Sequence, residues 1–241
     1  MKHFIKTFFK GLLLKNGYEI NSFKGHSILQ PNPFEAIITE ISFKNPIFFD
    51  IGMNHGQTLK QMKLHFPTCI IHGFEPNAQC FKSLEDVYND SSIILNQKAV
   101  GAEEGVLRFN QYSWDALSSV LERVFTTSHI VDSYDVDVTS VDAYCKTHKI
   151  SHIHVLKTDT EGYELRVLEG ARHMLERQKI QFVYVELFFE SHFVDQSTAG
   201  DIINFLLQHH FKLIRFYEFE RSKAGFVSRT DALFVNPNFK P

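Results

Sequence analysis

The sequence has no excess of basic residues, no cysteine pairing pattern and no long apolar run. Its 241 residues carry 25 lysines and arginines against 28 aspartates and glutamates. This balance argues against a nucleic-acid partner, because such domains are clearly basic. Three cysteines, Cys69, Cys80 and Cys145, form no CxxC or zinc spacing and are odd in number. They favour a reducing compartment, which predicts a cytoplasmic protein and not a disulfide scaffold.

The N-terminal segment, residues 1–44, is predicted to be a helical extension that packs on a main domain of residues 45–241. Residues 1–14 mix lysines with Phe, Ile and Leu but contain no uninterrupted apolar stretch and no small-residue cleavage site. We therefore expect neither a signal peptide nor a transmembrane segment. A basic amphipathic helix fits the pattern, and peripheral contact with a membrane surface stays open beside packing on the domain.

From about residue 46 onward, short apolar runs alternate with helical patterns, which is typical of an α/β fold with crossover helices. Strands are expected at 47–51, 69–74, 93–100, 105–111, 136–138, 152–157, 182–187, 212–217 and 232–235. Helices are expected at 57–65, 78–88, from 140, 163–177 and 199–209, and residues 113–133 are predicted to be irregular. No helix fits between the last two strands, so they must be antiparallel neighbours. The pattern predicts a doubly wound, mostly parallel seven-stranded sheet with one antiparallel strand.

The first expected strand ends in a glycine-bearing turn, D-I-G-M-N-H-G, that begins at Asp50. Gly52 can take backbone angles that a side chain forbids, and Gly56 lets the following helix begin close to a ligand. Asp50 and Asn54 offer a carboxylate and an amide suited to a ligand's amino and carboxyl groups, and His55 lies in the same turn. Without a G-x-G-x-x-G pattern, the turn indicates a cofactor that has no pyrophosphate. An ordinary strand-to-helix turn capped by Asn54 is the alternative.

The second expected strand ends on a carboxylate, Glu75, followed by Pro76. A carboxylate is costly to bury without hydrogen-bond donors, and the two hydroxyls of a ribose supply them. With the glycine turn upstream, Glu75 indicates an adenosyl cofactor. A surface glutamate before a proline is the alternative.

A third segment, L-K-T-D-T-E-G-Y-E, places Lys157, Asp159 and Glu161 where a later strand stops. Alternation brings the three side chains to one side if the strand persists, which forces like charges together. Such a cluster often marks a site. The alternative is a charged loop with Glu161 near a helix N-terminus.

The three motifs D-I-G-M-N-H-G, F-E-P-N and L-K-T-D-T-E-G-Y-E resemble the FkbM-type family of S-adenosylmethionine-dependent methyltransferases over roughly Asn45 to Asn236. The resemblance implies a class I, Rossmann-like fold and O-methylation of a hydroxyl on a sugar, glycan or other secondary metabolite. It assigns the glycine turn to the methionine end of the cofactor and Glu75 to the ribose. It assigns Asp159 and Glu161 to the acceptor side. The chain departs from the family at Met53, where alanine is usual, which adds bulk but removes no ligating group.

Methyl transfer needs an acceptor oxygen in line with the methyl group and a base for its proton. We expect Asp159 to be the base, with Glu161 as orienting partner or alternative base and Lys157 offsetting their charge. No metal is assigned, although a divalent ion held by Asp159, Glu161 and Glu186 is conceivable. A non-catalytic binding module and a nicotinamide-dependent oxidoreductase are the rival functions.

Overall fold

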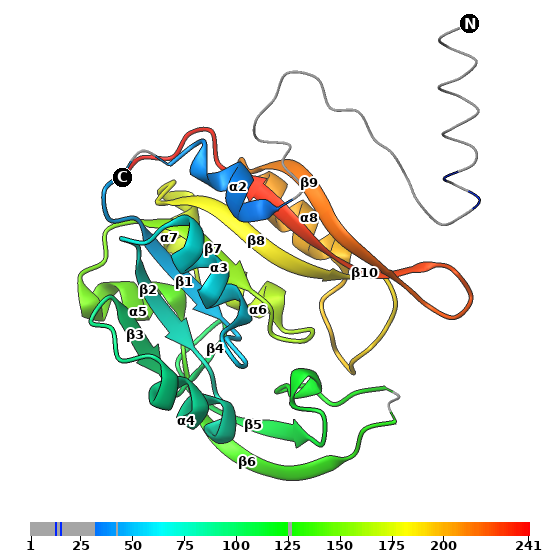
Figure 1. The fold of residues 1–241 in the computed structure, drawn as a ribbon. Coiled ribbons are helices and arrows are strands. Elements are labelled where there is room, and N and C mark those ends of the chain that lie inside the picture. The colour runs from blue at the N-terminus through cyan, green and yellow to red at the C-terminus, as the bar shows by residue number, and fades with distance from the viewer. Residues whose placement is uncertain (1–12, 14, 16–31, 42, 125–126) are drawn as a thin grey trace, which may run out of the picture.

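The computed structural model describes residues 13, 15, 32–41, 43–124 and 127–241 (Figure 1). The expected amphipathic helix of residues 1–14 lies, apart from position 13, outside the described residues. The later part of the expected extension contains helix α2 (Pro33–Ile38), which buries Phe34 and Ile37 in one of the two main apolar clusters of the domain.

The main sheet has seven strands in the order β3-β2-β1-β7-β8-β10-β9. Their bounds are β1 (Ile47–Ile51), β2 (Ile70–Phe74), β3 (Ile93–Asn96), β7 (Ile153–Thr158), β8 (Ile180–Phe188), β9 (Lys212–Arg221) and β10 (Val227–Val235). Strand β10 is antiparallel to both of its neighbours, and the other pairings are parallel. The predicted fold class is therefore confirmed.

Helices cover both faces of this sheet, which makes it doubly wound. One face packs against α2, α3 (Gln57–His65) and α4 (Ala78–Val87); the other packs against α5 (Val141–His148), α6 (Glu164–Glu169), α7 (Arg172–Glu176) and α8 (Ala199–Gln208). In Figure 1, α2 and α3 lie in front of the sheet and α8 lies behind it. Side chains of β1 alternate between the two faces of the sheet. Phe48 packs in the apolar cluster on the face of α2, α3 and α4, and Phe49 and Ile51 pack in the cluster on the face of α5 to α8.

A second, three-stranded sheet contains β4 (Ala99–Val100), β5 (Gly105–Tyr112) and β6 (Ile130–Thr139), in the order β4-β6-β5 (Figure 1). The expected single strand at 93–100 is wrong, because the chain turns at Asn96, whose side-chain amide donates to the carbonyl of Gly73 and to the hydroxyl of Tyr144. The expected strand at 136–138 is too short. Residues 130–135 also pair with β5, although their exposure removes the apolar alternation that predicts a strand.

The expected helix at 163–177 is divided into α6 and α7 at Gly170. A Cβ at this glycine would lie 2.0 Å from the carbonyl oxygen of Gly101, so the chain passes close to another backbone there. Asp142 then accepts hydrogen bonds from two backbone N–H groups in α7, at 2.8 and 3.0 Å. Because Asp142 caps the N-terminus of α7 from outside the helix, α7 forms as a separate helix. A local sequence pattern cannot reveal a cap that comes from another segment.

Gly52 joins the turn after β1 to the loop after β7. Its φ is +78°, and a Cβ would lie 1.8 Å from the carbonyl oxygen of Asp159. The backbone N–H of Asp159 in turn donates to the carbonyl of Ile51 at 3.1 Å. Two segments more than 100 residues apart therefore touch through their backbones, with no room for a side chain between them.

We expect Gly52→Ala to destabilise the fold more than Gly225→Ala does. Gly225 also has a positive φ, +87°, but no atom of the described residues lies within 4 Å of its Cβ position. Gly225→Ala therefore measures only the cost of placing a side chain at a positive φ, which is about 1–2 kcal/mol. Any further loss of stability in Gly52→Ala comes from the overlap with the Asp159 carbonyl. Urea unfolding of both variants, compared at constant m, measures the difference. Equal losses in the two variants would contradict the close approach.

Candidate active site

A cleft of about 330 Å³ opens at the carboxyl ends of the parallel strands. This is where open α/β sheets bind their ligands. The predicted site residues that line it are Gly52, Asn54, Glu75, Pro76, Lys157, Asp159 and Glu161. Asp50, His55 and Gly56 are not among the lining residues in the described part of the chain. The structure thus brings together most of the predicted site, from three segments far apart in sequence.

Glu75 is buried at the end of β2 and accepts two backbone hydrogen bonds. One carboxylate oxygen accepts from the N–H of Asn54 at 2.6 Å, and the other accepts from the N–H of Asn77 at 2.8 Å. Burial raises the pKa of Glu75 to about 7, although these two hydrogen bonds act against the shift. Each oxygen keeps further acceptor capacity, so the carboxylate is held rigidly and can still accept from a ligand.

The turn after β1 is built differently from an ordinary helix cap. Gly56, at φ +78°, is the N-cap residue of α3, so the alternative in which Asn54 caps this helix is wrong. The side chain of Asn54 accepts from the N–H of His55 at 2.8 Å. Gly56 faces Leu84 and Tyr88, whose side chains would lie 3.0–3.2 Å from a Cβ. Asn54 therefore lines the cleft, whereas Gly56 packs the turn against α4.

Asp50 and Lys157 form a buried ion pair beneath this turn. The Lys157 ammonium lies 3.2 Å from Asp50 and 3.5 Å from Asp159, and it donates to the carbonyl of Gly52 at 2.7 Å. Burial raises the pKa of Asp50 in spite of Lys157. Burial also acts to lower the pKa of Lys157, but Asp50 and Asp159 raise it above its ordinary value. Both Asp50 oxygens are closed to solvent, so the expected direct contact with a cofactor amino group is not available to them.

The loop after β7 folds around the buried carboxylate of Glu164. This side chain accepts from the N–H and hydroxyl of Thr160 and from the N–H of Gly162. Glu161, between them, has a φ of 55°, which is uncommon for a residue with a side chain. Such backbone strain gathers at functional sites, and here it turns Glu161 into the cleft.

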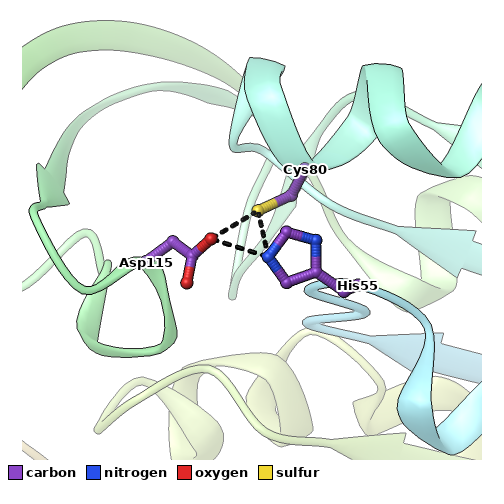
Figure 2. Close-up of side chains that lie close together, drawn as sticks. All are labelled: His55, Cys80 and Asp115. Atoms are coloured by element: carbon purple, nitrogen blue, oxygen red, sulfur yellow. Dashed lines mark hydrogen bonds and ion pairs between the residues drawn. The ribbon is translucent and has the colours of Figure 1, made fainter.

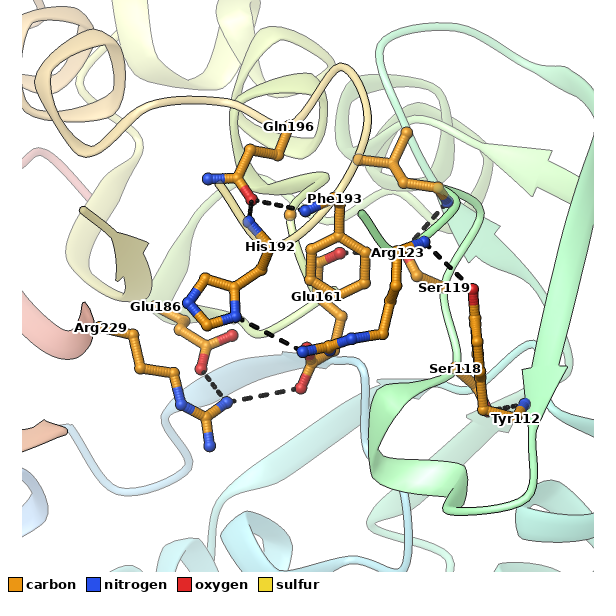
Figure 3. A network of polar contacts seen from close by, with 12 residues as sticks. Tyr112, Ser118, Ser119, Arg123, Glu161, Glu186, His192, Phe193, Gln196 and Arg229 are labelled. Atoms are coloured by element: carbon orange, nitrogen blue, oxygen red, sulfur yellow. Dashed lines mark hydrogen bonds and ion pairs between the residues drawn. The ribbon is translucent and has the colours of Figure 1, made fainter. Parts of the chain in front are cut away.

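Three carboxylates, Asp159, Glu161 and Glu186, meet within 4.8 Å. Two arginines, Arg123 and Arg229, pair with Glu161 and Glu186 (Figure 3). Arg229 lies 2.8 Å from Glu186 and 3.6 Å from Glu161, and Arg123 lies 3.4 Å from Glu161. Burial and Asp159 raise the pKa of Glu161 to about 8 despite the arginines. Burial and the neighbouring acids raise the pKa of Glu186 well above its usual range. Burial and mutual repulsion therefore work against the charged forms of Glu161 and Glu186.

The conceivable divalent ion at these carboxylates stays a prediction. The oxygens are close enough to share an ion, but the two guanidinium groups already supply positive charge to Glu161 and Glu186.

Arg123, Arg229 and Asp231 belong to the site but were not expected from the sequence. Arg229 and Asp231 lie on β10, just before residue 232, where the sequence predicts that this strand begins. The only sequence signal for them is the alternation of two charged residues directly before the apolar run. Arg123 lies in the irregular segment, with its guanidinium 4.6 Å from the ring centre of Phe193. Nothing in the local sequence marks it.

The strand order with a reversed β10, and a cleft where the glycine turn meets a buried acid, define a class I methyltransferase. The model of the methyltransferase FkbM domain matches residues 50–213, and the chain belongs to this family. Its cofactor is S-adenosylmethionine. No curated protein matches the chain.

Solved structures of methyltransferases are similar in fold at low sequence identity. A Clostridium thermocellum protein with a proposed rRNA-methylase activity is 8% identical with a TM-score of 0.50, covering 91% of this chain and all of that one (100%). M. capricolum TrmK, solved with S-adenosylhomocysteine, is 10% identical at 0.48 over 88% and 71% of the two chains. Precorrin-6y C5,15-methyltransferase from Geobacter metallireducens is 9% identical at 0.46 over 90% and 93%. In the described part of this chain, no helix combines the length and apolar character needed to cross a membrane.

We expect Lys157→Met to cost about 3–5 kcal/mol of stability, because it leaves Asp50 buried without its cation. The double variant Asp50→Asn/Lys157→Met should recover much of this loss. An uncompensated Asp50 has a raised pKa and opposes folding increasingly as pH rises, so the deficit of the single variant should be larger at pH 8 than at pH 5. Urea unfolding measures all three effects.

The matched control is Lys60→Met, on the exposed face of α3, which should change stability little. If the double variant were no more stable than Lys157→Met, the ammonium would not be neutralising Asp50.

Proposed function

We propose that this methyltransferase transfers a methyl group to a hydroxyl oxygen of an uncharged or cationic small molecule or glycan. The acidic lining of the cleft carries the proposal. Its acids are Glu75, Asp115, Asp159, Glu161, Glu186, Glu218, Glu220 and Asp231, against the cations Lys98, Lys157 and Arg229. Carboxylates accept strong hydrogen bonds from hydroxyl groups, and an excess of them repels the phosphates of a nucleic acid.

The residues present fit the family's cofactor. Glu75 would accept hydrogen bonds from the ribose hydroxyls through the acceptor capacity that its two backbone donors leave free. Phe74, Val100 and Phe109 give the same cleft apolar walls suited to a flat base. Gly52 and Asn54 would lie along the methionine end, and Asp50 would act only through Lys157 and the Gly52 carbonyl. The cofactor supplies an already activated methyl group on its sulfonium.

Asp159 is the proposed general base. Its side chain is 45% exposed, lines the cleft and is paired with Lys157, which favours a carboxylate that is charged and reachable. Burial raises the pKa of Glu161 to about 8 and that of Glu186 well above its usual range, so both are better suited to orient the acceptor through hydrogen bonds. The acceptor O–H bond would break toward Asp159 as the oxygen bonds to the methyl carbon in line, while the carbon–sulfur bond of the sulfonium would break and S-adenosylhomocysteine would leave.

The three cysteines are buried free thiols, which supports the proposed action in the cytoplasm.

We expect Asp159→Asn to lower turnover by about 10²–10⁴-fold while the affinity for S-adenosylhomocysteine changes little. The measurement is S-adenosylhomocysteine formation with a panel of monosaccharides, amino sugars and glycans, and with nucleotide-sugars and tRNA as the anionic comparisons. Asp135→Asn, on the exposed side of β6, is the matched control and should keep full activity. Full turnover in Asp159→Asn would remove this residue from the role of base. Methylation of tRNA alone would overturn the acceptor class.

The affinity for S-adenosylhomocysteine should fall as pH drops through about 7. Ribose hydroxyls donate to the ionised carboxylate, whereas the pKa of Glu75 is about 7 in the free chain, so binding must then release a proton. The fall is at most about tenfold per pH unit. Calorimetry between pH 6 and 8 measures it. Glu75→Gln should bind more weakly and lose this part of the pH dependence, and Glu103→Gln, on an exposed loop, should keep it. An unchanged pH slope in Glu75→Gln would rule out the ribose contact.

A further inference from the structure

A histidine, a cysteine and an aspartate meet beside the cleft (Figure 2). His55 comes from the turn after β1, Cys80 from the first turn of α4, and Asp115 from the short 3₁₀-helix η2 (Asp115–Leu117). His55 Nε2 lies 2.7 Å from Asp115 Oδ2, and Cys80 Sγ lies 4.0 Å from that nitrogen and 3.8 Å from that oxygen. Side chains from three separate segments thus point their potential ligand atoms at one another.

These distances are close to those of a metal site. With zinc bonds of about 2.3 Å to sulfur and about 2.0–2.2 Å to nitrogen or oxygen, tetrahedral geometry sets neighbouring ligand atoms roughly 3.3–3.6 Å apart. The present nitrogen–oxygen distance is shorter and the two sulfur distances are longer. A cation placed among the three atoms would need shifts of less than about 1 Å, and it would replace the hydrogen bond between His55 and Asp115.

The kinds of ligand atom select the kind of cation. A thiolate and an imidazole suit borderline-soft zinc and disfavour magnesium or calcium, which take oxygen ligands. Cys80 is buried, whereas the side chains of His55 and Asp115 are 47% and 36% exposed, so the fourth position faces solvent. Three protein ligands and an open position reached by water form a complete zinc coordination sphere.

We propose that His55, Cys80 and Asp115 bind a zinc ion, with water as the fourth ligand. Binding forms the zinc–sulfur bond and releases the proton of the Cys80 thiol to solvent.

The ion would tie together walls of the cofactor cleft. Asp115 lines the cleft itself, and His55 directly follows the lining residue Asn54. The zinc ion would thus hold η2 against the turn after β1 and against α4. Asp115 is also one of the acids of the cleft lining, but the zinc site does not involve Asp159, the proposed base.

The test is metal binding by the untagged chain after treatment with a chelator. Zn²⁺ is titrated in competition with a chromophoric chelator, and Co²⁺ is titrated separately for its thiolate-to-metal charge-transfer band. We expect one site per chain. Cys80→Ala should weaken zinc binding by about 100-fold or more and abolish the cobalt band, and His55→Gln and Asp115→Asn should each weaken it about tenfold or more. Cys69→Ala and Cys145→Ala remove the other two thiols and should leave both readouts unchanged.

Equal zinc affinity in the wild-type chain and Cys80→Ala, or a cobalt complex without a thiolate band, would overturn the proposal. If Cys80→Ala does not fold, His55→Gln and Asp115→Asn decide, because both side chains are partly exposed and their loss leaves the core intact. Zinc affinity unchanged in these two variants would equally overturn it.

Discussion

The buried ion pair between Asp50 and Lys157 is the interaction on which the site depends. The two residues are register partners on β1 and β7, and the same ammonium holds the carbonyl of Gly52 and faces Asp159. One cation thus fixes the end of one strand, the turn that follows it and the first acid of the opposite loop. Because burying such a pair is expensive, it gives specificity of position more than stability. The close backbone contact between Gly52 and Asp159 then restricts how the turn after β1 packs against the loop after β7.

In the site around this ion pair, carboxylates outnumber the cations that can neutralise them. Glu75, Glu161, Glu164 and Glu186 are all buried, and burial raises the pKa of each. Their partners differ: Glu75 and Glu164 accept hydrogen bonds from backbone N–H groups, whereas Glu161 and Glu186 pair with arginines. Rigid, backbone-held acids suit the recognition of a constant cofactor.

The sequence predicts the fold class and the cleft because apolar periodicity and strand ends are local signals. Glu75 and Asp159 were found in this way, since each follows directly on an apolar strand. The burial of Asp50 was missed, because its cation lies 107 residues away and only strand register brings the two together. Arg123 was missed for a similar reason, since its partners come from other segments. Long-range pairing therefore limits what sequence patterns can reveal here.

The position of Arg123, between β5 and β6, has a consequence for how the acceptor site can evolve. The strands and their end loops supply the carboxylates, but this arginine comes from the excursion between β5 and β6, where it pairs with Glu161 (Figure 3). This loop contributes little to the main sheet, so insertions and replacements in it are tolerated better than in the strands. Exchanging it would alter the charge that meets an acceptor, whereas Glu75 and the turn at Gly52 belong to other segments and would stay in place. Relatives with one frame and divergent acceptors can arise by this route.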